Sequence, residues 1–219
     1  MRDDNGIKWV TRTAKWSAVA QVILGLVTLI GFIKVPTENT QFLWVLLVLD
    51  IVVQLIEFVF YAYFVCVRRL DTWYRYLDWY ISTPIMLIQT MALLEYMNDA
   101  TISIDRFTRA HSNDMIYVVL VNWIMLSFGL SAEFEWIPRT VAIGFGFLPF
   151  VAVFTAMFAR FSRGDAASVG ILVFVCVVWA LYGVAAFLSY APKNIAYNCL
   201  DVVSKNFYGV VVAGILLAS

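Results

Sequence analysis

Seven long apolar segments, separated by polar breaks, account for almost the whole chain. Each is close to the roughly 20 residues that an α-helix needs to cross the hydrocarbon core of a bilayer. Most connections are short, so neighbouring helices should run antiparallel within one up-and-down bundle that takes in residues 1–219, and only 98–114 is expected to be a longer polar link. The pattern predicts membrane-spanning helices at 10–33, 41–66, 73–97, 115–132, 138–160, 166–189 and 195–218.

The composition is that of an integral membrane protein. The 219 residues are 63% hydrophobic and 14% charged, and the mean hydropathy is +0.84. The formal net charge is zero and there is no run of like charges, so nothing in the sequence would attract nucleic acid. The lipid bilayer is therefore the first partner that the sequence implies.

The distribution of Lys and Arg favours a cytoplasmic N-terminus, because more of them fall on the N-terminal side of the predicted bundle. Several of these residues, including Arg75 and Arg139, lie within predicted helices, where they do not count as loop charges. An odd number of spans places the C-terminus on the opposite side of the membrane from the N-terminus.

The last predicted helix carries an acid and a base near its middle, in the segment Asp201-Val-Val-Ser-Lys205. A lone ammonium at the centre of a membrane helix costs roughly 2.5–3.5 kcal/mol, so such a lysine is expected to be paired, to face the bundle interior and to be functional. Asp201 lies one helical turn before Lys205 and is available as a partner. Two interpretations remain open: a structural ion pair, or a lysine that has condensed with an aldehyde and has a carboxylate counter-ion.

The third predicted helix contains most of the remaining polar residues. Arg75, Asp78 and Ser82 recur at intervals of three and four residues, so they share one helix face, and Pro84 predicts a kink. Asp78 is a second acid available to Lys205. Without Lys205, the same residues would be explained as contacts that hold helices together.

The second predicted helix has a polar stripe, because Asp50, Gln54 and Glu57 recur at i, i+4 and i+7. Two carboxylates in one membrane helix require water, cations or protons beside them. The stripe favours a wet, cation-attracting pathway, unless Asp50 lies at the membrane surface and only Glu57 is buried. Ser17 on the first helix fits such a pathway, but bridging between helices would explain it as well.

Two motifs together resemble the microbial rhodopsin family: Arg75-Tyr-x-Asp-Trp79-x-x-Ser-Thr-Pro84 on the third helix and Asp201-x-x-x-Lys205 on the seventh. Asn122-Trp-Ile-Met125 and Trp179-x-x-Tyr182 fit the same pattern, and the resemblance covers all seven spans. It implies an all-α membrane protein, a seven-transmembrane helix bundle of the microbial rhodopsin type. It also implies an extracellular N-terminus and a cytoplasmic C-terminus, and we adopt this orientation over the one that the loop charges favour.

The resemblance further implies that all-trans retinal is bound to Lys205 as a protonated Schiff base. Asp78 and Asp201 would be its counter-ions, modulated by Arg75. Neither a metal site nor an enzymatic activity is implied. The chromophore site that the resemblance implies consists of Lys205, Asp78, Asp201, Arg75, Trp79, Ser82, Thr83, Met86, Asn122, Met125, Trp179, Tyr182 and Ser204.

Gln89 stands where outward proton pumps of the family usually carry a carboxylate that donates a proton, and an amide cannot supply one. The polar residues of helices one, two and seven instead look like the constrictions of light-gated cation channels, particularly those of giant-virus rhodopsins. We therefore expect a light-gated channel for monovalent cations or protons. A slow outward proton pump and a photosensor are the alternatives, and a homo-oligomer is left open. The expected ion path consists of Ser17, Asp50, Gln54, Glu57, Gln89 and Asn198.

Overall fold

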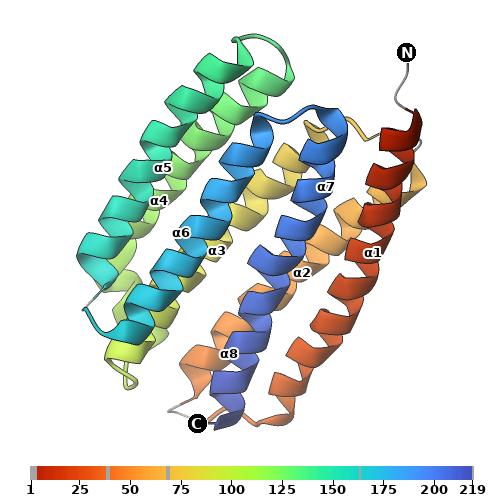
Figure 1. The fold of residues 1–219 in the computed structure, drawn as a ribbon. Coiled ribbons are helices and arrows are strands. Elements are labelled where there is room, and N and C mark those ends of the chain that lie inside the picture. Colours follow the sequence, from red (N-terminus) through yellow and green to blue (C-terminus); the bar gives the residue numbers. More distant parts are fainter. Residues whose placement is uncertain (1–3, 38–39, 68–69, 163, 219) are drawn as a thin grey trace.

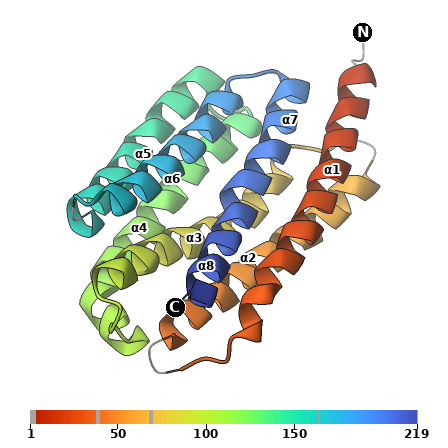
Figure 2. The ribbon, with the colours of Figure 1, turned by 60° about the horizontal axis from the view of Figure 1, so that its bottom comes forward.

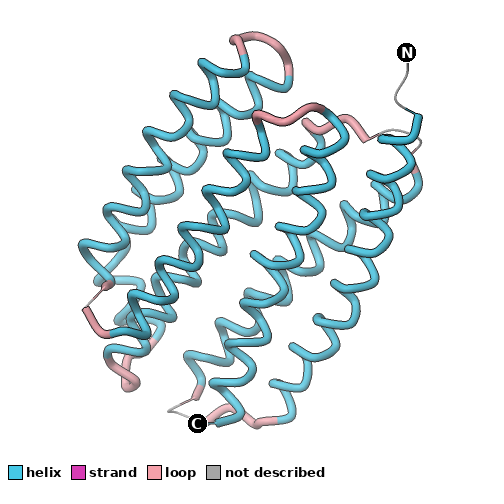
Figure 3. Tube along the Cα trace, in the orientation of Figure 1, coloured by secondary structure: helices cyan, strands magenta, loops and turns pink. Residues whose placement is uncertain are grey.

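The protein is a bundle of long helices joined by short loops, and no strand occurs in the part of the chain that the structure describes (Figures 1 and 3). The computed structural model describes residues 4–37, 40–67, 70–162 and 164–218. The first half contains α1 (Asp4–Leu29) with the short 3-10 helix η1 (Ile30–Ile33), α2 (Gln41–Cys66), α3 (Tyr74–Asn98) and α4 (Ile104–Glu133). The second half contains α5 (Arg139–Phe161), α6 (Ala166–Ala186), α7 (Tyr190–Asp201), the π-helix η2 (Val202–Asn206) and α8 (Phe207–Ala218).

The helices form a closed ring, because each packs against its neighbours in sequence and α7 also packs against α1. Both ribbon views place α4, α5 and α6 on one side and α1 and α2 on the other, with α3 and α7 between them (Figures 1 and 2). The segments α7, η2 and α8 form one continuous rod, so the N- and C-termini lie at opposite ends of the bundle.

The predicted seven-helix membrane bundle is confirmed. Among the residues that the structure describes, six helical segments are long and apolar enough to cross a membrane, and the α7–α8 rod is one of them. The exception is α3, which is long enough to span but buries Arg75 and Asp78 within the bundle. Its polarity comes from the groups that form the site described below.

The helix bounds differ from the sequence prediction chiefly at α4. The segment 98–114 was expected to be a polar link, yet α4 already begins at Ile104. The hydroxyl of Ser103 accepts a hydrogen bond from the backbone N–H of Arg106, and Arg109 pairs with Asp105 one turn away. A search for apolar runs misses this start, because the first turns of the helix are stabilised by polar groups.

A similar polar cap begins α6. The Asp165 carboxylate accepts hydrogen bonds from the Ser168 hydroxyl and from the backbone N–H groups of Ala167 and Ser168. The Ser168 hydroxyl is the main reason that the pKa of Asp165 lies below its usual value, and the backbone bonds lower it further. The short loop between α5 and α6 therefore ends in a well-defined helix start.

Candidate functional site

Lys205 and Asp78 form a buried ion pair at the centre of the bundle. The distance from Lys205 Nζ to Asp78 Oδ2 is 2.5 Å, and the two side chains are 1% and 3% exposed. The lysine belongs to η2, where the rod widens from an α- to a π-helical turn, a feature that is frequent at functional sites. Asp78, which the sequence suggested as a second acid for this amine, is therefore in direct contact with it.

Asp201, the other expected counter-ion, makes different contacts. Its carboxylate accepts hydrogen bonds from the hydroxyls of Tyr61 and Tyr182, both at 2.8 Å, and pairs with Arg75 Nη1 at 3.1 Å. Within the described residues, Asp78 is thus the carboxylate in direct contact with Lys205. Asp201 instead joins the guanidinium on α3 to hydroxyls on α2 and α6.

The Arg75 guanidinium connects α3 to α7 through more than its ion pair. Its Nε donates to Asn194 Oδ1 at 3.1 Å and its Nη2 donates to Asn198 Oδ1 at 2.5 Å. Asn198 in turn donates to Thr13 Oγ1 of α1 at 2.8 Å. This buried network links the five helices α1, α2, α3, α6 and α7, and a change of charge at any member is felt by the rest.

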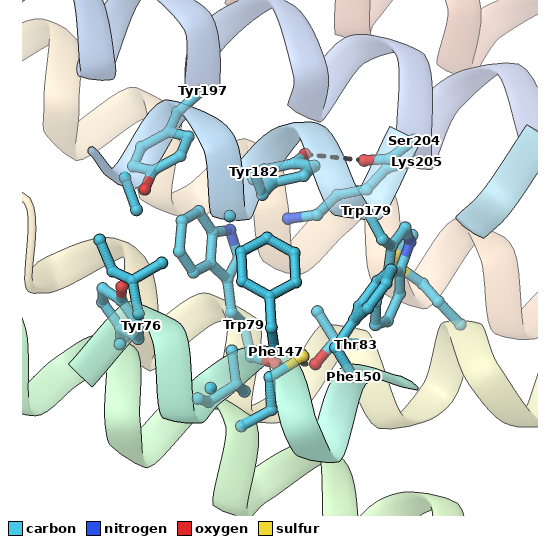
Figure 4. Close-up of a pocket in the computed structure, with 18 residues that line it drawn as sticks. Tyr76, Trp79, Thr83, Phe147, Phe150, Trp179, Tyr182, Tyr197, Ser204 and Lys205 are labelled. Carbon is cyan, nitrogen blue, oxygen red and sulfur yellow. Dashed lines mark hydrogen bonds between the residues drawn. The ribbon is translucent and has the colours of Figure 1, made fainter. Parts of the chain in front are cut away.

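A largely apolar cavity of about 110 Å³ adjoins the ion pair. Lys205 extends into it, and Figure 4 shows its nitrogen between the rings of Trp79 and Trp179. Tyr182, above the lysine in this view, also donates to or accepts from Ser204 at 2.9 Å. Of the predicted chromophore-site residues, those that line the cavity are Trp79, Thr83, Met86, Met125, Trp179, Tyr182, Ser204 and Lys205.

Two other predicted residues support the cavity from outside. The Asn122 side chain donates to Thr83 Oγ1 at 2.8 Å and so couples α4 to α3. Ser82 is fully buried and its hydroxyl donates to the backbone carbonyl of Asp78 at 3.0 Å. Neither is part of the cavity wall.

The sequence reasoning missed several wall residues. Phe147 and Phe150 come from α5, a helix with no buried charge to mark its inner face, and Tyr76 and Tyr197 close the end near Trp79 (Figure 4). Aromatic residues are so frequent in this chain, at 16%, that their spacing alone does not single out these four.

The expected ion-path residues fall into two clusters, of which the first adjoins the Arg75 network. Ser17 donates to the backbone carbonyl of Asn198 at 2.8 Å, and Gln21 donates to Glu57 Oε1 at 3.1 Å and to the Ser17 hydroxyl at 3.2 Å. Glu57 is fully buried. The structure thus brings Ser17, Glu57 and Asn198 together between α1, α2 and α7.

The second cluster lies further along α2. Gln54 donates to Asp50 Oδ2 at 2.5 Å and to Thr28 Oγ1 at 3.3 Å, and Asp50, at 2% exposure, is buried within the bundle. Gln89 joins neither cluster: its amide donates to the backbone carbonyl of Leu46 at 3.0 Å.

Several buried polar atoms in this region have no protein partner in the described structure. Glu57 Oε2, Gln21 Oε1 and Gln54 Oε1 belong to the two clusters. Both side-chain polar atoms of Asn206, next to Lys205, are also without one, and η2 packs against α1 and α2. Asn206 was not predicted, although an amide beside the lysine of a membrane helix is a signal of the same kind. Buried groups like these need water or an ion.

The chain is similar to known proteins in both sequence and fold. The family model of bacteriorhodopsin-like proteins matches residues 10–218. No curated protein sequence matches the chain. Among solved structures, the chain is similar to the viral rhodopsin OLPVRII, with a TM-score of 0.81 and 24% identity over 94% of this chain and 96% of that one.

Two further structures have the same fold. A blue light-absorbing proteorhodopsin from Med12 has a TM-score of 0.75 and 18% identity, over 96% of this chain and 98% of that one. A light-driven proton pump from Leptosphaeria maculans has a TM-score of 0.76 and 17% identity, over 96% and 97%. The chain therefore belongs to the bacteriorhodopsin-like family of microbial rhodopsins, integral membrane proteins that bind retinal and act as light-driven transporters or photoreceptors.

Proposed function

We propose that the protein is a light-gated cation channel that binds all-trans retinal covalently at Lys205. The observation that carries the proposal is the pair of buried polar clusters between α1, α2 and the α7–α8 rod, with carboxylates at Asp50 and Glu57. Carboxylate and amide oxygens that lack protein partners attract water and cations and repel anions.

The apolar cavity fits a polyene aldehyde. Its walls are aromatic and aliphatic, the two tryptophans Trp79 and Trp179 flank its length, and its one amine is that of Lys205. Bound retinal supplies the absorption of visible light and a change of shape at the lysine nitrogen. Asp78, 2.5 Å from that nitrogen, stabilises its positive charge and is placed to accept its proton.

Charge transfer within the pair gates the path. When the proton of Nζ moves to Asp78, both charges of the pair disappear, and the attraction between α3 and η2 is lost. Arg75 and Asp201 then hold the charge of the network alone, and their bonds to Asn198 and Tyr61 rearrange. Water enters beside Glu57, and cations pass along the two clusters.

The covalent attachment is tested with Lys205→Ala. Because no other amine lines the cavity, the variant should remain colourless after reconstitution with retinal and removal of the free aldehyde. Absorption spectra of the purified variant and wild type check this. Visible colour retained by the variant would reject Lys205 as the attachment residue.

The channel itself is tested by voltage clamp under illumination. A passive cation path gives a photocurrent that reverses sign with the membrane potential, at a voltage that follows the cation gradient but not the chloride gradient. A light-induced current that keeps one direction at every potential would reject the channel and favour a pump.

Glu57 offers a sharper test of the path. Glu57→Gln removes the carboxyl group from the first cluster and keeps the side-chain size, so cation photocurrent or selectivity should change while the colour stays nearly that of wild type. Asp105→Asn, on the exposed start of α4, is the matched control and should leave the current unchanged. If Glu57→Gln moved only the spectrum, Glu57 would belong to the chromophore site instead.

A second candidate function is a slow outward proton pump, favoured by the direct contact between Asp78 and Lys205. Such a pump would acidify the medium around illuminated cells in a manner that a protonophore abolishes. It would also produce a current of constant direction, so the voltage-clamp experiment separates the two functions.

A further inference from the structure

The outer face of α1 changes from basic to apolar partway along the helix. Both ribbon views place α1 at the edge of the bundle, and the residues that it buries lie on the opposite face (Figures 1 and 2). Exposed side chains recur on the outer face at intervals of three and four residues, first as cations and then as aliphatic groups. The series consists of Lys8, Arg12 and Lys15, here called the basic stripe, followed by Val19, Ile23, Leu26, Ile30 and Ile33.

The apolar part of this face locates the basic stripe relative to the membrane. A hydrocarbon core of roughly 30 Å takes up about 20 residues of helix. Counted back from Ile33, this length ends between Arg12 and Lys15. The long side chain of Lys15 can extend outward along the helix and keep its ammonium in the polar layer. The three cations of the stripe therefore lie at the level of the phospholipid headgroups.

Two exposed tryptophans flank the stripe. Trp9 is 54% and Trp16 is 65% exposed, and the Arg12 guanidinium lies 5.1 Å from the centre of a Trp9 ring. This cation–π contact holds Arg12 along the helix surface. Tryptophan side chains favour the interface between lipid and water, where the indole ring meets apolar groups and its N–H meets polar ones. The stripe and its two tryptophans thus form one surface at a single depth in the membrane.

The cations of the stripe have no acidic partner in the part of the chain that the structure describes. Asp4 lies on the same face one turn before Lys8, but the two do not form an ion pair. The exposed arginines at the start of α4 differ in this respect, because each pairs with an aspartate. A row of exposed cations without partners is complementary to an anionic group.

We propose that the basic stripe of α1 binds the phosphate headgroups of anionic phospholipids. The guanidinium of Arg12 can donate two parallel N–H bonds to one phosphate, and Lys8 and Lys15 add positive charge on either side. A zwitterionic headgroup is a poorer ligand, because its own ammonium is repelled by the same cations. The inference depends neither on retinal nor on ion conduction, and it holds for either orientation in the membrane.

The bound headgroup would act on the turns of α1 that the buried Arg75 network uses. On the inner face of these turns, Asn198 Nδ2 donates to the backbone carbonyl of Val10 at 3.2 Å and to Thr13 Oγ1 at 2.8 Å. A lipid held on the outer face fixes the same turns against α7. A ligand that binds only this folded arrangement stabilises the protein by mass action.

The first test compares two lipids by tryptophan fluorescence in proteoliposomes. Phosphatidylcholine vesicles contain an equal fraction of either brominated phosphatidylglycerol or brominated phosphatidylcholine, and bromine quenches nearby indole rings. The wild type should be quenched more strongly by the anionic lipid at low salt. Each cation contributes roughly fivefold to this preference, so Lys8→Gln/Arg12→Gln/Lys15→Gln should be quenched equally by both lipids. Equal quenching of the wild type, or an unchanged preference in the triple variant, would overturn the proposal.

A matched control removes the same charge from the opposite end of the bundle. Lys34→Gln/Arg106→Gln/Arg109→Gln should keep the wild-type preference for phosphatidylglycerol. Loss of the preference in this control would show that net charge, rather than the stripe, attracts the lipid. Millimolar inorganic phosphate, compared with chloride at the same ionic strength, should leave the preference in place. If phosphate abolished it, the stripe would be a site for free anions and the assignment to a lipid would be wrong.

Thermal unfolding of the retinal-free protein gives a second readout. In vesicles where phosphatidylglycerol is present at ten times its dissociation constant, the melting temperature of the wild type should be about 3–6 °C higher than in pure phosphatidylcholine. The variant without the stripe should melt at the same temperature in both lipids, and the matched control should behave as wild type. Equal melting temperatures of the wild type in the two lipids would contradict the binding of lipid to the folded bundle.

Discussion

At the scale of single residues, the buried ion pair of Lys205 and Asp78 leads to a prediction about stability that can be tested without retinal. Asp78→Asn leaves an ammonium in the bundle without its direct partner, which should lower the free energy of unfolding of the retinal-free protein by about 3 kcal/mol. Adding Lys205→Met removes the stranded charge and should recover most of that loss. Thermal unfolding in detergent measures both, and a single variant as stable as wild type would contradict the pairing.

Residue spacing was informative wherever a polar group stood in an apolar helix. It led to Lys205, Asp78 and Glu57, because a charge in a membrane is costly and needs a partner. It did not lead to Phe147 or Phe150, since an aromatic side chain is equally favourable against lipid, against another helix or on a cavity wall. The sequence also could not decide which carboxylate contacts the lysine. Asp201 lies one turn before Lys205 on the same helix and Asp78 lies on another helix, so both were plausible partners.

At the scale of helices, Gly31 in η1 lies closely packed against α2 and α8. A Cβ there would lie 2.6 Å from Leu47 Cδ2 on α2 and 3.3 Å from the Ala213 Cα on α8. Gly31→Ala should therefore lower the free energy of unfolding by about 1–3 kcal/mol through overpacking. Gly214→Ala, on α8 with open space at its Cβ, is the matched control and should be neutral or stabilising by up to about 1 kcal/mol. Equal thermal stabilities of the two variants would contradict this account of the packing.

Helix boundaries were predictable where apolar character and helix coincide, as in α2 and α5. They were not predictable where a helix continues into polar residues, as at the start of α4, or where its pitch changes, as in η2. A hydropathy search finds the apolar part of a helix that lies in the bilayer and misses its polar ends. A periodicity of 3.6 residues assumes a constant number of residues per turn. The π-helical turn at Lys205 is therefore invisible to both.

At the scale of the whole molecule, the loop charges and the family resemblance predict opposite orientations in the membrane. The fold provides exposed positions at both ends of the bundle where the orientation can be tested. The loop that contains Ser189 lies at the N-terminal end of the bundle, and the turn that contains Ala100 lies at the opposite end (Figure 1). Both residues are exposed, and Ser189 makes no side-chain hydrogen bond at its helix cap, so a cysteine at either position should not disturb the fold.

We expect an extracellular N-terminus, since the loop charges that favour the reverse include residues such as Arg75 that the bundle buries. In a chain whose native cysteines are replaced by serine, Ser189→Cys should react with a membrane-impermeant maleimide on intact cells. Ala100→Cys should react only after the membrane is permeabilised. The opposite labelling pattern would place the N-terminus in the cytoplasm, as the loop charges predict. The cluster around Glu57, nearer the N-terminal end of the bundle, would then lie toward the cytoplasm and the cluster around Asp50 toward the outside.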